Sequence, residues 1–197
     1  MKITIDEEVR AKFPELHIFF RVIQKGRPGP TMDDAAYSDA ALTDVEFADY
    51  KLFREKVSGD TLLAVERLLH RGKDDLPQPD PITNLIIGAS YATRLPVTIF
   101  CDDGFGSITI RFSKRRDAME VGGCYEKVEP GLLVADTERG ILGILGIKSS
   151  DVGKLKDTSK SLVVLSFGCS AGTNKKSKEL VDQASDRLFL RSSAAHR

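Results

Sequence analysis

The spacing of apolar positions predicts two strands and two helices in the first part of the chain. Residues 1–6 alternate apolar and polar side chains, and residues 16–24 are rich in β-branched and aromatic ones, so both ranges predict strands. A short helical turn is expected between them, ending near Pro14. Apolar residues three and four positions apart predict amphipathic helices over 44–57 and 61–71. The run KGRPGPTMDD, with two glycines and two prolines, predicts a loop before these helices.

The segment LPQPDPITNLIIGASYATRLPVTIFCDD combines a helix and a strand with clear boundaries. Asp80 is a good N-cap, and Pro81 suits the first helical position because its missing N–H has no helical partner to lose. Pro96 disfavours helical backbone at the residue before it, so the chain extends there. We therefore predict a helix over 81–94 and a strand over 97–101.

From this strand onward, short apolar runs alternate with turn signals. Strands are predicted at VTIFC, SITIRFSK, AMEVGG, GLLVAD, GILGIL and SLVVLSF, with turns at DDGFG, KRRD, EPG and TERG. A C-terminal helical tail is expected over 174–197, fraying toward its end. The pattern predicts an α+β fold with a mixed, largely antiparallel β core, sheet-like or barrel-like, flanked by helices in one domain over 1–197.

Composition indicates an ordinary globular chain. The 197 residues are 41% hydrophobic and 29% charged. The longest apolar runs are too short to span a bilayer, and the N-terminus carries acids where an export signal has an apolar core. Three widely spaced cysteines, Cys101, Cys124 and Cys169, are typical of small hydrophobic residues in a reducing compartment. We therefore expect a cytoplasmic protein.

Positive charge gathers in the second half of the chain, although the net charge is zero. Seven lysines within 148–178 face only two aspartates, and KRRD concentrates charge at a predicted hairpin tip. Such groups either contact phosphates or form a solvated surface. The candidates for contact with an RNA backbone are Arg115, Arg116, Lys148, Lys154, Lys156, Lys175 and Lys176.

Spacing alone reveals no catalytic motif. The sequence has no Walker loop, HExxH or GxSxG, and GFG lies in a predicted turn. None of the three histidines, His17, His70 and His196, has an evident Ser, Cys or carboxylate partner. Asp102 and Asp103 are neighbours in an extended segment, so they point to opposite sides and do not form an acid–base pair. We expect neither a metal nor a cofactor.

An ordered succession of segments resembles the B3/B4 domain of the phenylalanyl-tRNA synthetase β subunit and its free-standing relatives. These segments are AVERLLHR, LPQPDPITNLIIGASYATRLPVTIFCDD, ITIRFSKRRDAMEVGG, PGLLVADTERGILGILG and DTSKSLVVLSFG. They cover about residues 40–168, and the opening MKITIDEEVRAKFPEL is also similar to the free-standing family. In the synthetase this domain hydrolyses the ester bond of tyrosine wrongly attached to the phenylalanine tRNA.

The resemblance implies a substrate pocket whose polar side chains differ from the family's. Thr98 stands where the bacterial synthetase has a histidine, Ile86 and Ile87 where it has a Thr-Asn pair, and Ser166 near an expected glutamate. The free-standing pattern's Asp and Asn become Asn84 and Ile87, and its Asp after the strand becomes Cys101. The glycines at 122, 123, 143 and 146 match. The implied pocket residues are Asn84, Ser90, Thr98, Gly122, Gly123, Gly143 and Ser166, each of which also has an ordinary structural role in its helix, strand or turn.

Three functions follow as hypotheses. The first is a stand-alone domain that recognises misaminoacylated tRNA and hydrolyses its ester, with tRNA as partner. Backbone N–H groups at Gly143 or Gly122 would then face the oxyanion, and the ribose hydroxyl would help to place the water. The second is a non-catalytic module that binds tRNA, an amino-acid-like ligand or a protein. The third is an unrelated small-molecule enzyme that uses the same cavity.

Overall fold

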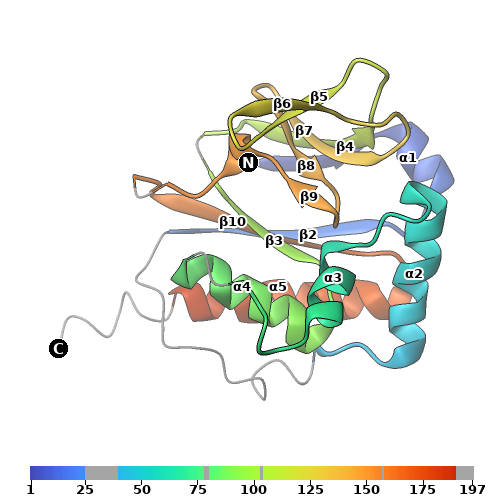
Figure 1. The fold of residues 1–197 in the computed structure, drawn as a ribbon, viewed down its shortest axis with the longest axis vertical. Helices are drawn as coiled ribbons and strands as arrows, with labels where there is room; N and C mark the ends of the chain where they lie inside the picture. Colours follow the sequence, from blue (N-terminus) through green and yellow to red (C-terminus); the bar gives the residue numbers. More distant parts are fainter. Residues whose placement is uncertain (25–39, 78–79, 103, 157, 190–197) are drawn as a thin grey trace.

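The computed structural model describes residues 1–24, 40–77, 80–102, 104–156 and 158–189. Figure 1 shows two β-sheets stacked on a helical layer. The loop predicted at KGRPGPTMDD and the end of the predicted C-terminal tail lie outside the described residues.

Ten strands, five α-helices and a 3₁₀ turn make up the described part of the chain. In chain order they are β1 (Lys2–Ile5), α1 (Glu7–Lys12), β2 (His17–Gln24), α2 (Asp44–Ser58), α3 (Ala64–Arg71), α4 (Pro81–Thr93), β3 (Val97–Cys101), β4 (Ser107–Phe112), β5 (Ala118–Val121), β6 (Cys124–Lys127), β7 (Leu133–Thr137), β8 (Gly140–Ile144), β9 (Lys148–Ser149), η2 (Asp151–Gly153), β10 (Ser161–Gly168) and α5 (Ala171–Phe189).

The strands form two larger sheets and a separate hairpin. The five-stranded sheet has the order β1-β4-β7-β8-β9, in which β1 is parallel to β4 and the other pairs are antiparallel. The three-stranded sheet, β2-β10-β3, is antiparallel throughout. Strands β5 and β6 pair only with each other among the described residues. The fold is therefore α+β with open sheets, and the barrel-like alternative is wrong.

Two apolar cores hold the layers together. The first contains Ile108, Leu133 and Leu142 of the five-stranded sheet and Leu165 and Phe167 of β10. The second joins the opposite face of the three-stranded sheet to α4 and α5. In Figure 1 the five-stranded sheet lies above the three-stranded one, and α4 and α5 lie below both. Because successive strand residues point to opposite faces, β10 contributes alternately to the two cores.

Most predicted elements are confirmed, with differences at β6, β9 and the starts of two helices. The helix predicted over 61–71 begins at Ala64, with the buried Leu63 at its N-cap. β6 was not predicted because all four of its residues are exposed and show no apolar alternation. The two-residue β9 was also missed. Helix α5 begins at Ala171, ahead of the predicted start, and its residues Leu180 and Ala184 are buried in the cores.

Candidate functional site

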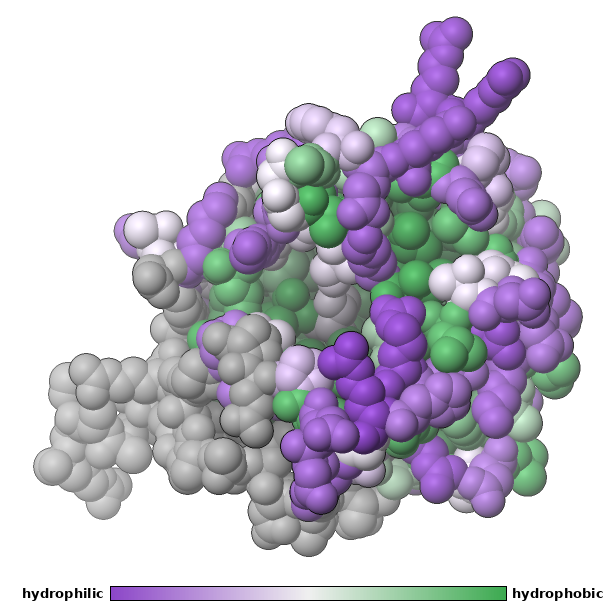
Figure 2. All heavy atoms as spheres, in the orientation of Figure 1, coloured by the Kyte–Doolittle hydropathy of each residue, from purple (hydrophilic) through white to green (hydrophobic). Residues whose placement is uncertain are grey.

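A pocket of about 620 Å³ lies between α3, α4, β3 and the β8–β9 region. Its inner walls are apolar and include Ile86, Ile87, Leu142, Leu145 and Leu165. Figure 2 shows this face hollowed between the strands and the helices, with green hydrophobic atoms inside and purple hydrophilic side chains around the opening. The pocket thus combines an apolar interior with a charged mouth, as small-molecule sites commonly do.

The α4–β3 segment forms one wall of this pocket, and local chemistry fixes both of its ends. The Asp80 carboxylate accepts hydrogen bonds from the N–H groups of Ile82 and Thr83, both at 3.0 Å, and so caps α4. Arg94 ends the helix in the left-handed region with φ of 62°, and its N–H donates to the Ser90 carbonyl at 2.9 Å. The chain then extends through Pro96 into β3.

Strand β3 is an edge strand, and its free edge opens into the pocket. Among the described residues it pairs with β10 alone, and the N–H of Asp102 donates to the Ser161 carbonyl at 3.0 Å. In an antiparallel ladder the backbone groups alternate in direction, so those of Val97 and Ile99 point away from β10. The Ser90 hydroxyl accepts from the Val97 N–H at 3.3 Å. The N–H and C=O of Ile99 have no partner among the described residues, and Ile99 lines the pocket.

Of the side chains proposed from sequence, Ser90 and Thr98 line this pocket. The register pairs Thr98 with Leu165 and Val97 with Ser166, so the Thr98 and Ser166 side chains point to opposite faces of the sheet. Ser166 is fully buried, and its hydroxyl donates to the Pro96 carbonyl at 2.7 Å. Asn84 lies outside the lining, with its amide oxygen buried and unpaired among the described residues.

The predicted glycines separate into two places. Gly143 lines the pocket from β8, and a Cβ there would lie 2.5 Å from the Lys148 carbonyl oxygen. The Leu145 N–H donates to the Leu133 carbonyl across the β7–β8 ladder. Because backbone groups two residues apart on a strand point to the same side, the Gly143 N–H also points toward β7. Gly122 and Gly123, with φ of 60° and 77°, make the tight turn between β5 and β6 and do not line the pocket.

The basic residues predicted to contact RNA are also dispersed. Lys148 and Lys154 line the pocket mouth. Arg115 and Arg116 lie in the exposed turn before β5, Lys156 follows η2, and Lys175 and Lys176 lie on α5. Two further cations at the mouth, Arg67 and Arg71 on α3, were missed by sequence reasoning. Their spacing of four residues on the helix, away from its apolar stripe, was the available signal.

The described lining contains two carboxylates, and both accept hydrogen bonds from the protein. Asp80 caps α4, and Asp151 accepts from the Gly123 N–H at 2.9 Å. Neither His17 nor His70 lines the pocket. Within the described residues no group of three or more His, Cys, Asp or Glu side chains could hold a metal ion. No helix in the described part of the chain is long and apolar enough to cross a membrane.

The clearest pKa shifts belong to groups outside the pocket. Burial raises the pKa of Tyr50 well above its ordinary value, although a hydrogen bond with Ser177 opposes the rise. Burial also raises the pKa of the Cys169 thiol to about 12. A thiol with so high a pKa is a poor nucleophile at neutral pH.

The fold resembles a known synthetase fragment, whereas sequence comparison identifies no relative. No protein-family model and no curated protein matches the sequence. The crystal structure of an N-terminal fragment of the phenylalanyl-tRNA synthetase β subunit from Pyrococcus horikoshii superposes with a TM-score of 0.55 at 10% identity. The match covers 95% of this chain and 48% of that fragment, so the chain spans about half of its length. The two proteins share a fold.

Proposed function

We propose that this chain is a tRNA-related module whose pocket receives the aminoacylated end of a tRNA. The proposal rests on the order in which apolar, hydrogen-bonding and positively charged groups follow one another from the interior of the pocket to its mouth. Its interior is apolar, its free hydrogen-bonding groups lie on β3, and its mouth carries cations. An aminoacyl-tRNA has the same order of groups, from an apolar side chain through an amino ester to a phosphate backbone. A volume of about 620 Å³ is within the range of sites for such ligands.

Specific groups on β3 would bind the amino ester. The Ile99 carbonyl would accept a hydrogen bond from the α-amino group. The Ile99 N–H or the Thr98 hydroxyl, which has no partner among the described residues, would donate to the ester carbonyl. The structural likeness to the synthetase fragment and the sequence resemblance to the B3/B4 domain both support tRNA as the source of this ester.

Ester hydrolysis is the first candidate activity of this site. A bound water would attack the ester carbonyl, and the Thr98 hydroxyl and Ile99 N–H would face the developing oxyanion. The bond to the ribose oxygen would then break, and that oxygen would take a proton from the attacking water. Because Asp80 and Asp151 already accept protein hydrogen bonds, the tRNA ribose hydroxyl would orient the water. The same engagement of both carboxylates favours the second candidate, a module that binds aminoacyl-tRNA without cleaving it.

Ester loss from tRNAs carrying Tyr, Phe or Ile distinguishes the two candidates. Deacylation by the wild type should fall in Thr98→Val, which keeps the side chain's shape but removes its hydroxyl. Thr109→Val is the matched control, because Thr109 lies on β4 outside the pocket. Ester loss no faster than the blank for every charged tRNA would exclude the deacylase.

Binding is tested separately with charged and uncharged tRNA. The wild type should prefer the charged form, and Ile87→Trp, which fills the pocket, should abolish that preference. Leu52→Trp on the exposed face of α2 is the control. Equal affinity of the wild type for both forms would refute recognition of the aminoacyl end, whatever the hydrolysis assay gives.

A further inference from the structure

The charges at the pocket mouth are unequally paired among the described residues. Four cations line the pocket: Arg67 and Arg71 from α3, Lys148 from β9, and Lys154 after η2. Arg67 donates to the carbonyls of Leu62 and Ile147. Lys148 pairs with Glu126 at 2.6 Å. Arg71 and Lys154 have no side-chain partner among the described residues.

We propose that Arg71 and Lys154 bind the phosphate that precedes the terminal nucleoside of the ligand. This inference rests on the proposed function and specifies its substrate class: an aminoacyl ester carried on a short 3′ phosphodiester, with no need for the body of the tRNA. Arg71 and Lys154 approach the pocket from segments far apart in the sequence. Both line the same pocket, so a phosphate at its mouth would be attracted by both charges.

Position distinguishes these two cations from the other basic residues of the surface. An unpaired lysine in open water gains little from a single anion. Beside an apolar pocket filled by a ligand, less water screens the contact, so the attraction is stronger. Arginine also presents a planar fork of donors that matches phosphate geometry.

The chemistry of an esterified ligand favours phosphate over carboxylate as the bound anion. Once the amino acid is esterified, its carboxyl group carries no charge, and its α-amino group is a donor. The anion nearest to the ester is then the phosphodiester 5′ to the terminal nucleoside. Neither mouth carboxylate forms an ion pair with Arg71 or Lys154 among the described residues: Asp80 accepts hydrogen bonds at the start of α4, and Asp151 accepts one from the Gly123 N–H.

Puromycin and its extended form CpCpPuromycin provide the test. Both carry an apolar methoxyphenyl group on a stable aminoacyl amide, but only the second has phosphodiesters. In calorimetric titrations we expect the wild type to bind CpCpPuromycin about tenfold tighter, as one charge-assisted contact predicts. In the Arg71→Gln, Lys154→Gln double variant this advantage should disappear, while the affinity for puromycin itself should stay unchanged.

The matched control is Arg115→Gln with Arg116→Gln, which removes two exposed charges outside the pocket lining. This variant should keep the advantage of CpCpPuromycin. If puromycin binds and the phosphodiesters add nothing, or if the control loses as much as the double variant, the phosphate site is refuted while the aminoacyl pocket stands. If the wild type binds neither probe, the proposed function fails and the phosphate site fails with it.

Discussion

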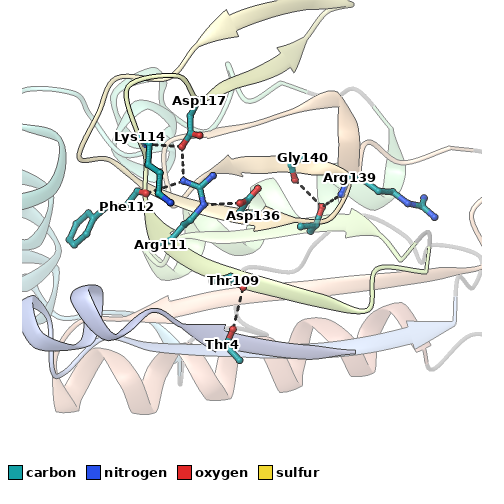
Figure 3. A network of polar contacts seen from close by, with 10 residues as sticks. Thr4, Thr109, Arg111, Phe112, Lys114, Asp117, Asp136, Arg139 and Gly140 are labelled. Atoms are coloured by element: carbon teal, nitrogen blue, oxygen red, sulfur yellow. Dashed lines mark hydrogen bonds and ion pairs between the residues drawn. The ribbon is translucent and has the colours of Figure 1, made fainter.

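Charged side chains on the five-stranded sheet form ion pairs within the protein, whereas two cations at the pocket mouth have no such partner among the described residues. On the five-stranded sheet, Arg111 donates through Nη1 to Asp117 at 2.6 Å and through Nε to Asp136 at 2.7 Å. Figure 3 shows these side chains turned toward one another, with the Lys114 N–H also donating to Asp117. At the pocket mouth, Arg71 and Lys154 lack any such side-chain partner among the described residues.

The difference indicates which polar groups serve the fold and which are available to a ligand. Each charged group of the Arg111 network has a partner, and its side chains are only 15–27% exposed. Removing one member would therefore leave others buried and unpaired. A group without a protein partner contributes little to stability, so substituting it should change binding more than folding.

The largest effect is expected from Arg111→Met. This substitution keeps much of the side-chain volume but leaves Asp117 and Asp136 without their shared cation. We expect a loss of about 3 kcal/mol in the free energy of unfolding, measured by urea denaturation. The neighbouring exposed Arg116→Met should cost less than about 0.5 kcal/mol. Similar losses in the two variants would show that the network is not structural.

A smaller effect should appear in the pH dependence of stability. Burial would raise the pKa of Asp117, but the hydrogen bonds from Arg111 and the Lys114 N–H hold it below its ordinary value of 3.8. The ionised carboxylate therefore adds stability above that value, and the contribution is lost as pH falls through the lower pKa of the folded state. Unfolding measured from about pH 5 to pH 2 should decline less steeply in Asp117→Asn than in the wild type. Equal declines of the unfolding free energy in the two proteins would contradict a lowered pKa of Asp117 in the folded state.

Local signals explain why the α4–β3 segment could be predicted from sequence. Asp80, Pro81 and Pro96 act on backbone within a few residues of themselves, so their effect is independent of the rest of the fold. The helix ends at Thr93 and the strand begins at Val97, close to the predicted boundaries. The exposed β6 carries no such signal, because its pairing depends on the adjacent Gly122–Gly123 turn.

The composition of the pocket could be predicted only in part because it depends on long-range register. Thr98 pairs with Leu165, the residue before Ser166, so the side chains of Thr98 and Ser166 lie on opposite faces of the sheet. Nothing in the local sequence of either strand determines that pairing. The available backbone of Ile99 likewise depends on β3 being an edge strand, which is a property of the assembled sheet.

Asp80 lines the pocket and yet accepts hydrogen bonds from the protein, so its substitution should affect folding, unlike that of the unpaired cations at the mouth. Asp80→Ala removes the cap of α4, including the 2.6 Å hydrogen bond from the Thr83 hydroxyl. We expect a loss of about 1 kcal/mol in unfolding free energy. The exposed Asp75→Ala serves as the control and should be near neutral. A neutral Asp80→Ala would mean that the carboxylate is free for ligand chemistry after all.

The smallest stability effect is expected from Thr98→Val. Its hydroxyl has no partner among the described residues, so removing it should change the unfolding free energy by less than about 0.5 kcal/mol. Ser166→Ala, on the opposite face of the same sheet, should cost about 1 kcal/mol because it removes the hydrogen bond to Pro96. For aminoacyl-tRNA the order should reverse, with Thr98→Val weakening binding and Ser166→Ala leaving it intact. If the same variant has the larger effect on both unfolding free energy and aminoacyl-tRNA affinity, then having a hydrogen-bond partner in the protein does not distinguish structural groups from ligand-binding groups.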